Sequence, residues 1–598
     1  MPQAKYSVNQ HPIQTLLTWV QSSEIAIPEI QRPFVWDASQ VRDLLDSLYQ
    51  GYPVGYLIVW KNPAVKLKDG STSNGKKILI DGQQRVTALM ASILGKKVIN
   101  KAYKKTNIRI AFHPQEERFE VSNTAIQRDK TWIADISQVL DPEVRLMRFV
   151  KEYCQKNQIE DEDAIHDSIE RLKSIVNNQI GIIGLNSDLD IEEVTEIFIR
   201  INSKGAELSQ ADFVMSKIAA NEEYGGNTLR KLIDYFCHLA IAPEYFDDIA
   251  GNDKEFAATP YLSKIEWLKK ENDDLYDPGY TDLLRVAFTS QFKRGRLREL
   301  VALLSGRNFE TRAFEAEIAE RSFDTLEKGA LQFVSETNFK RFLMILRSAG
   351  FIDSSLIGSQ NAVNFAYIIF LILREENENP AKIEKLVKRW YAMSILTNRY
   401  AGNPEGAFDY DIKRIREYGV EKYLKDEEDG QLSDAFWTYR LPQRLNTSVA
   451  SSPYYRLYLA AQAKLQDKGF LSKSISIHDL ILHRGDIHHI FPKAYLKKNG
   501  YSRSHYNQVA NYVLMQSEIN ISIGDRAPAD YFKDIYKQCN NGDLKYGGIN
   551  SIDDLKENLY QHCIPEGIEK MTKEDYQDFL EARRKIMSQK IKKYYQSL

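Results

Sequence analysis

The chain has 598 residues, which is too long for one hydrophobic core and predicts two to four domains. Its 80 basic and 82 acidic residues give a net charge of −2, which excludes a cationic field over the whole protein. Any contact with nucleic acid must therefore rest on local basic patches. The four cysteines lie far apart without a C-x-x-C pair, which argues against a zinc ribbon or a disulfide framework and fits a reducing cytosol.

No segment is predicted to enter a membrane. The N-terminus lacks the apolar core of a signal peptide. The longest aliphatic and aromatic run covers residues 365–373, whereas a membrane span needs about 20 residues. We interpret the run as a buried helix and expect a cytoplasmic protein.

The first region, residues 1–220, mixes strand and helix signals. Apolar periodicity predicts helices over residues 40–49, 86–94 and 191–201. Short apolar runs predict strands over residues 56–60 and 78–80, and a hairpin over residues 108–112 and 119–121. This alternation predicts an α/β domain within an α+β multidomain protein.

Three polar clusters in this region carry donors for a nucleotide. They are Asp81-Gly82-Gln83-Gln84-Arg85 between a strand and a helix, then Gln31, Arg32 and Trp36, and then Arg200, Asn202 and Lys204. Amides at a helix start favour phosphate, and an arginine can bind phosphate through two parallel hydrogen bonds. The alternative for the first cluster is a tight turn in which the arginine only pairs with a neighbouring acid.

The next region, residues 221–430, is predicted to be almost wholly helical, because apolar residues recur at spacings of three and four. The charged stretch 425–430 is interpreted as a break and a domain boundary. The third region, residues 431–598, begins with helices and ends in a helix with a basic tail. Half of the chain's 10 histidines fall between residues 478 and 505.

The pair His488-His489 is the most informative feature of the third region. Neighbouring histidines on opposite faces of a strand can divide two tasks, because one can bind a metal while the other activates water. The sequence predicts a strand ending near Phe491, a polar loop, a second strand over residues 509–515 that contains Asn511, and a helix that holds Asn520. A pair of surface histidines is the alternative.

This segment resembles the HNH family of ββα-metal nucleases in its His-Asn-Asn form. It is more closely similar to the DUF1524 domain of GmrSD-type restriction enzymes, through H-H-I-F-P, A-N-Y-V-L-M and N-x-x-I-G. The resemblance implies that His489 is the general base and that His488 and Asn520 bind a divalent metal, Mg²⁺ or Mn²⁺. It adds Asn511 to the catalytic set, as a residue that orients the base or braces the loop.

The three polar clusters together resemble the DUF262 domain, the GmrS-like half of the same enzymes, over about residues 10–220. That domain is similar to the ParB and sulfiredoxin fold. The resemblance implies binding or hydrolysis of a nucleoside triphosphate (NTP) such as ATP or GTP with a divalent metal. It also implies recognition of altered DNA.

The two resemblances imply a BrxU-like, modification-dependent type IV restriction enzyme that cuts double-stranded phage DNA carrying modified cytosine. Its expected domains are a sensor over residues 1–220, a helical coupling region over 221–430 and a nuclease over 431–598. The alternatives are an SspE-like nickase that senses phosphorothioate DNA, an NTP-dependent regulatory DNA-binding protein with an inactive nuclease domain, and a toxin-like nuclease acting on RNA. A homodimer would suit cleavage of both strands.

Overall fold

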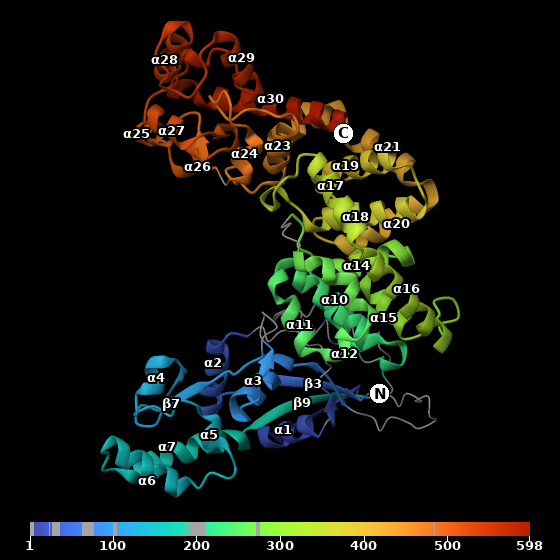
Figure 1. Cartoon of the computed structure of the whole chain (residues 1–598), viewed down its shortest axis with the longest axis vertical. Coiled ribbons are helices and arrows are strands. Elements are labelled where there is room, and N and C mark those ends of the chain that lie inside the picture. The colour runs from blue at the N-terminus through green and yellow to red at the C-terminus, as the bar shows by residue number, and fades with distance from the viewer. Residues whose placement is uncertain are drawn as a thin grey trace. The chain divides into compact units, whose positions relative to one another are not determined.

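The computed structural model describes residues 5–22, 24–26, 36–61, 77–99, 105–186, 189, 210–219, 221–270, 275–483 and 485–598 (Figure 1). Contacts between residues divide the chain into two compact units, and each is described by itself. Unit 1 comprises residues 1–269 and 298–324, and unit 2 comprises residues 270–297 and 325–598. The boundaries predicted at residues 220 and 430 do not coincide with this division.

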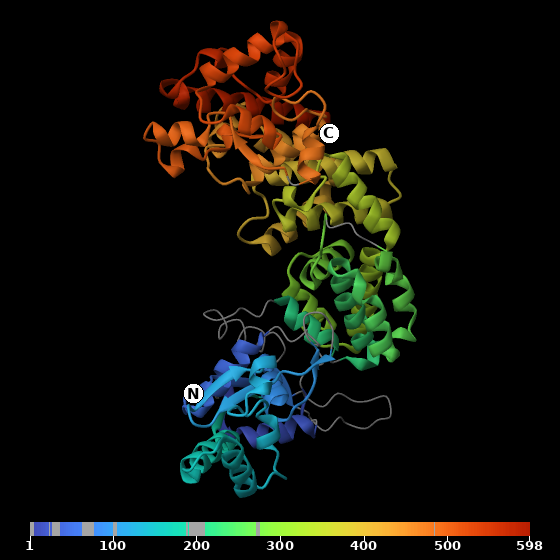
Figure 2. The same ribbon diagram turned by 60° about the vertical axis from the view of Figure 1, so that its left-hand side comes forward.

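Unit 1 begins with a five-stranded mixed sheet of strand order β1-β9-β3-β4-β2. The sheet belongs to the blue and teal part of the chain in Figure 2. Its strands are β1 (Tyr6–Pro12), β2 (Ile25–Ala26), β3 (Tyr56–Lys61), β4 (Lys77–Asp81) and β9 (Gln179–Leu185). Strand β9 pairs antiparallel with β1 and parallel with β3, while β4 pairs antiparallel with β3 and parallel with β2. The strands predicted over residues 56–60 and 78–80 are therefore confirmed, and they are direct neighbours.

Most of the helices that accompany this sheet share one buried apolar core with it. The accompanying helices are α1 (Ile13–Gln21), α2 (Ala38–Tyr49), α3 (Gln83–Ile93), α4 (Thr124–Arg128), α5 (Ser137–Leu140), α6 (Leu146–Asn157) and α7 (Glu162–Ser174). Helix α2 begins where Asp37 accepts a hydrogen bond from the Gln40 amide, which satisfies an otherwise unpaired donor of the first turn. Its spaced residues Val41, Leu45 and Leu48 join the core.

The predicted hairpin is also confirmed, as β7 (Ile110–His113) paired antiparallel with β8 (Arg118–Val121). A second small pair joins β5 (Val98–Ile99) to β6 (Lys105–Thr106). The helix predicted over residues 191–201 lies outside the described residues.

The remaining helices up to residue 334 follow the sheet in sequence. They are α9 (Gln210–Ala219), α10 (Gly226–Ile241), α11 (Phe246–Asn252), α12 (Lys254–Ala257), α13 (Pro260–Ile265), α14 (Tyr280–Phe292), α15 (Leu297–Leu304) and α16 (Ala316–Val334). No strand occurs among the described residues between 221 and 430, so the helical prediction for that stretch is confirmed.

Unit 2 continues with α17 (Glu336–Ser348), α18 (Gln360–Glu375), α19 (Pro380–Thr397), α20 (Pro404–Tyr418) and α21 (Val420–Gln431). Helix α18 is buried on every side from Ala362 to Leu373, as the apolar run predicted. Helices α14 and α19 pack against it. Within the ranges that the structure describes, no helix combines the length and the apolar character that a bilayer span requires.

The break predicted over residues 425–430 is wrong, because these residues lie inside α21. Two of its acids have partners far away in sequence. Glu428 receives two hydrogen bonds from Arg389, and Glu427 pairs with Arg399. A run of charges that is neutralised in this way supports a helix instead of ending it.

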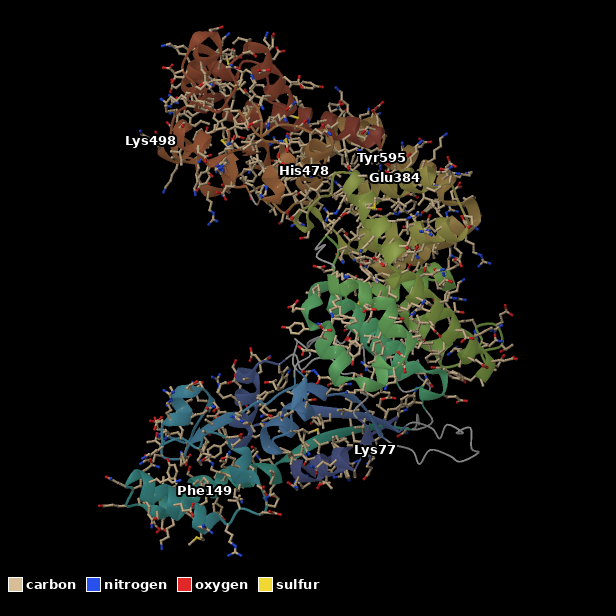
Figure 3. The ribbon with its side chains drawn as sticks, viewed as in Figure 1. Lys77, Phe149, Glu384, His478, Lys498 and Tyr595 are labelled. Carbon is tan, nitrogen blue, oxygen red and sulfur yellow. The ribbon has the colours of Figure 1, made fainter. Side chains whose placement is uncertain are left out.

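The C-terminal part of unit 2 is organised around its last helix, α30 (Tyr576–Ser597), which buries Phe579, Met587, Ile591 and Tyr594. Figure 3 marks Tyr595 near the end of this helix. The preceding elements are α22 (Leu441–Arg444), α23 (Pro453–Lys464), α24 (Ile477–Leu482), β10 (Ile487–His489), α25 (Lys493–Lys498), α26 (Arg503–Tyr506), β11 (Tyr512–Leu514), α27 (Ser517–Ile523), α28 (Pro528–Asn541) and α29 (Ile552–Gln561).

Candidate functional site

Strands β10 and β11 form an antiparallel pair in which His488 lies opposite Val513 and His489 lies opposite Tyr512. Helix α27 follows β11 after two residues, so the predicted order of strand, loop, strand and helix is present. The second strand is shorter than predicted. Residues 509–511 form a 3₁₀ turn instead, because the Asn511 amide donates to the Gln508 carbonyl and not across the strand pair.

His489 is half-buried, and its imidazole packs edge-on against Tyr512 with 5.2 Å between ring centroids. Its Nε2 lies 3.0 Å from Oδ1 of Asn507. An amide oxygen only accepts hydrogen bonds, so Nε2 carries the proton and Nδ1 holds the free lone pair. Sequence reasoning missed Asn507, which lies in a polar loop without a periodic pattern.

The electrostatic surroundings keep His489 neutral. Burial lowers the pKa of the His489 imidazole, and the neighbouring Lys493 and His488 act in the same direction, while the hydrogen bond to Asn507 opposes them. A neutral imidazole with a free lone pair can accept a proton from water. His489 thus has the state that a general base needs.

His488 and Asn520 can be tested for their fit to a metal. His488 is 8% exposed, and its Nε2 is buried without a hydrogen-bond partner among the described residues. A buried nitrogen without a partner is costly, and a cation would satisfy it. Asn520 is half-buried in α27, and its side chain makes no hydrogen bond within the described chain. An imidazole nitrogen and an amide oxygen are both groups that bind divalent metal ions, and such an ion would take its other ligands from water and phosphate.

Asn511 is fully buried and braces the loop after His489. Its Oδ1 accepts from the Phe491 amide at 2.8 Å, and its Nδ2 donates to the carbonyls of Phe491 at 3.1 Å and Tyr506 at 3.2 Å. These three bonds occupy both ends of the side-chain amide. Asn511 is therefore a positioning residue of this site.

Arg583 also holds the second strand, although the sequence placed it in a basic tail. It is fully buried in α30 and donates to the carbonyls of Ala510 at 2.8 Å and Tyr512 at 2.9 Å. Nothing in the sequence pattern separates it from its exposed neighbours. The strand pair that carries both histidines is thus fixed by a buried amide and a buried guanidinium.

In unit 1, the Asp81 to Arg85 cluster forms the turn from β4 into α3. Gly82 has a φ of +94°, and a Cβ there would lie 2.1 Å from Leu57 Cδ2, so only glycine fits. Arg85 donates to the carbonyls of Val54 at 3.0 Å and Tyr56 at 2.9 Å, and it pairs with Asp81 at 3.5 Å. The guanidinium therefore stabilises the turn and pairs with a neighbouring acid, as the alternative interpretation of this cluster expects.

The other members of the predicted nucleotide site are placed only in part. Gln83 donates to the Leu79 carbonyl at 3.4 Å, Gln84 is half-buried, and Trp36 packs against the core of unit 1. The residues Gln31, Arg32, Arg200, Asn202 and Lys204 lie outside the described residues. The assembly of the three clusters into one site therefore stays a prediction.

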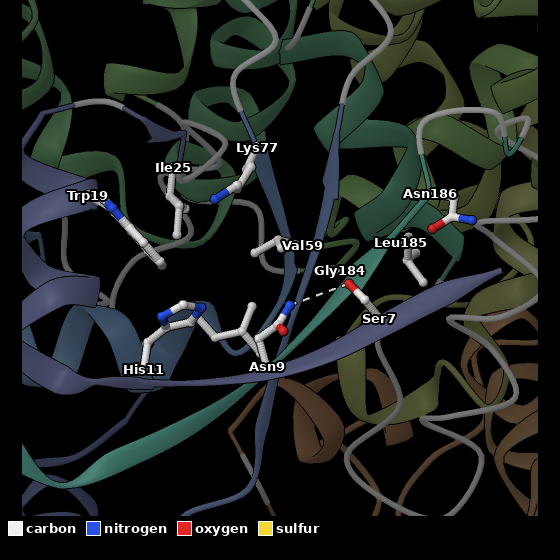
Figure 4. A pocket seen from close by; sticks show the side chains of 11 residues that line it. Ser7, Asn9, His11, Trp19, Ile25, Val59, Lys77, Gly184, Leu185 and Asn186 are labelled. Carbon is white, nitrogen blue, oxygen red and sulfur yellow. Dashed lines mark hydrogen bonds between the residues drawn. The ribbon is translucent and has the colours of Figure 1, made fainter. Parts of the chain in front are cut away.

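A pocket of about 410 Å³ opens on one face of the sheet (Figure 4). It lies near Lys77, the first residue of β4, whereas Asp81 is the last residue of that strand. Ser7, Asn9 and His11 of β1 line it, together with Trp19 and Lys77. The Lys77 ammonium lies 4.4 Å from the centre of the Trp19 ring and 3.5 Å from Glu24. The sequence did not indicate this pocket, because its polar residues alternate along a strand that had not been predicted.

Comparison with known proteins agrees with part of the sequence interpretation. Residues 13–219 match the family described as "GmrSD restriction endonuclease, N-terminal domain". This match supports the GmrSD-like, DUF262 relationship of the N-terminal region. The chain is also similar to the uncharacterized protein MJ0686 of Methanocaldococcus jannaschii, with 22% identity over 651 residues that cover 97% of this chain and 98% of that protein.

Proposed function

We propose that this protein is a metal-dependent DNA endonuclease whose HNH-type centre is built around His489. The observation that carries the proposal is the strand pair β10–β11 followed by α27, in which a neutral His489 is held through Nε2 by Asn507. The orphaned Nε2 of His488 supports a metal beside it. The family match of residues 13–219 supports restriction of DNA as the biological context.

In the proposed reaction, His489 accepts through Nδ1 the proton of the attacking water, and Asn507 keeps the hydrogen bond to Nε2 as the imidazolium forms. Asn511 and Arg583 keep the strand pair in register during this transfer. His488 and Asn520 would hold the divalent cation, which supplies positive charge to the scissile phosphate and the departing oxygen.

The N-terminal domain is proposed to sense modified cytosine and to bind NTP. The turn at Gly82 supports nucleotide binding, because it presents the start of an 11-residue helix to which phosphate is attracted. Arg85 already pairs with Asp81 and donates to the carbonyls of Val54 and Tyr56. The main-chain amides of the turn at Gly82 are therefore the better candidates for phosphate contacts. A fluorescent ATP or GTP analogue titrated against Gln84→Ala and the unchanged protein tests this part.

The decisive experiment measures cleavage of unmodified, hydroxymethylated, glucosylated and phosphorothioate DNA by the full chain. Each substrate is offered with Mg²⁺ or Mn²⁺, with and without NTP. The unchanged protein is compared with His489→Ala and with a matched control, His478→Ala, which removes an exposed histidine of α24 that Figure 3 marks. We expect cleavage of hydroxymethylated or glucosylated DNA that His489→Ala abolishes and His478→Ala leaves intact.

The other outcomes separate the alternatives. Nicking confined to phosphorothioate DNA would replace modified cytosine as the target. Cleavage of RNA but of no DNA would indicate a toxin-like nuclease. NTP binding without any cleavage would indicate a regulatory DNA-binding protein, and a homodimer is expected only if both strands are cut.

A further inference from the structure

An open pocket of about 590 Å³ in unit 2 borders the His489 centre. Its lining consists of Ser448, Ser502, Arg503, Ser504 and Asn507. Asn507 belongs to both places, because its Oδ1 holds His489 while the same side chain lines the pocket. The pocket is thus one side chain away from the imidazole.

The chemistry of the lining suits a phosphate. Three hydroxyls, one amide and one guanidinium surround the pocket, and its lining among the described residues contains no carboxylate. The Arg503 side chain is exposed and forms no ion pair within the described part of the chain. Serine, asparagine and arginine donors are the groups that proteins use to contact the phosphate oxygens of nucleic acid.

The walls of the pocket are fixed to the strand pair. Tyr512, the strand partner of His489, donates from its hydroxyl to the Ser448 carbonyl at 3.0 Å. Ser502 Oγ lies 3.0 Å from Ser504 Oγ and 2.7 Å from His505 Nδ1, so neighbouring side chains orient its hydroxyl. A group bound here would be placed at a defined position relative to His489.

Two further features add attraction for an anion. Asn507 uses Oδ1 for His489, and its Nδ2, which makes no hydrogen bond with the described residues, can donate into the pocket. Lys493 is exposed and lies close enough to His489 to affect it electrostatically. Arg503 and Lys493 thus add two exposed cationic side chains near His489, although the whole chain carries a net charge of −2.

We propose that this pocket is a subsite for one backbone phosphate of the DNA, next to the phosphate that is cut. The inference rests on the proposed nuclease function and deepens it, because it names the group that sets the strand beside His489. Arg503 and the serine hydroxyls bind this phosphate, and Asn507 connects its position to that of the imidazole.

Binding to a fluorescein-labelled DNA duplex tests the subsite. The full-length His489→Ala protein is titrated by fluorescence anisotropy over a series of salt concentrations, with and without Arg503→Gln. Loss of one phosphate contact is expected to weaken binding about tenfold and to reduce the slope of log K against log salt by about 0.9. The control Arg416→Gln removes an exposed arginine of α20 in the same unit and should change neither quantity.

The results distinguish this inference from the proposed function. Equal affinity and equal salt slope with and without Arg503→Gln would overturn the subsite, even if the protein cuts DNA. A reduced slope in a protein that cuts no nucleic acid would keep the subsite and overturn the nuclease. Because Arg503 is exposed and has no ion-pair partner among the residues that the structure describes, its replacement should leave the unfolding midpoint unchanged, which a urea titration checks.

Discussion

At the scale of single residues, the candidate site depends on buried polar side chains whose partners are main-chain groups. Asn511 is the clearest case, because all three of its hydrogen bonds go to backbone atoms of Phe491 and Tyr506. When one side chain satisfies three backbone groups, its substitution leaves buried groups without hydrogen-bond partners.

Asn511→Ala is therefore expected to lower the free energy of unfolding of unit 2 by about 2–3 kcal/mol, since it orphans the amide and carbonyl of Phe491. Cleavage should fall with it, because Phe491 lies two residues after His489. Urea unfolding and a cleavage assay measure the two effects. The control Asn499→Ala removes one local bond to the Tyr495 carbonyl and should cost less than about 1 kcal/mol. Unchanged stability of Asn511→Ala would contradict the bracing role.

His562 makes stability depend on pH. It is fully buried with Nε2 bonded to the Lys468 carbonyl at 2.8 Å, and burial lowers its pKa to about 3. Its pKa in the unfolded chain is about 6.5, so below that pH the unfolded chain binds a proton that the folded chain refuses. Stability should fall as pH drops from about 6.5 toward 3, by up to about 1.4 kcal/mol per pH unit from this residue.

The measurement compares urea midpoints at pH 7, 6 and 5 for the unchanged protein and His562→Gln. Glutamine keeps a donor for the Lys468 carbonyl but does not titrate, so its stability should depend less on pH. The difference between the two proteins isolates His562 from the carboxylates that titrate in the same range. Parallel curves would show that His562 is not buried as a neutral group.

At the scale of elements, the sequence pattern predicted the strands and helices whose formation depends on neighbouring residues in the chain. Apolar runs and spacing predicted β3, β4, the hairpin β7–β8 and helix α18. Features that depend on distant partners were missed or misread. The charged stretch 425–430 is helical because Arg389 and Arg399 neutralise two of its acids. Arg583 can be buried because it donates hydrogen bonds to three main-chain carbonyls.

The same reasoning explains the site. His488, His489, Asn511 and Asn520 were predicted because the motif and its spacing are local in the chain. Asn507 and the pocket around Arg503 were not, because they arise where a polar loop folds back against the strand pair. The sheet-face pocket beside Trp19 was not predicted for a similar reason. Its strand β1 pairs with β9, which lies far along the chain.

The anchoring of α21 yields a prediction with a control in the same helix. Glu428 is largely buried and receives hydrogen bonds from Arg389 and from the Tyr595 hydroxyl. Glu428→Ala leaves the guanidinium without its partner and should cost about 2 kcal/mol. Asp426→Ala removes an exposed pair with Lys422 and should cost less than about 0.5 kcal/mol. Urea unfolding of unit 2 checks both, and equal costs would contradict an anchoring role for Glu428.

At the scale of the whole molecule, the chain combines two compact units that each bury their own apolar residues. Units of this kind are expected to unfold in separate transitions, which calorimetry resolves. A ligand that binds one folded unit raises the midpoint of that unit alone, because stabilisation follows from binding to the native state.

The two proposed ligands should therefore act on different transitions. Mn²⁺ is expected to raise the midpoint of unit 2 and NTP that of unit 1, each with little effect on the other. His488→Ala and Asn520→Ala should remove the effect of Mn²⁺, whereas His483→Ala, which replaces an exposed histidine after α24, should retain it. If Mn²⁺ stabilises all three variants equally, His488 and Asn520 do not hold the metal. If NTP raises no midpoint, the N-terminal domain recognises DNA without a nucleotide, and cleavage of modified DNA should then proceed at the same rate with and without NTP.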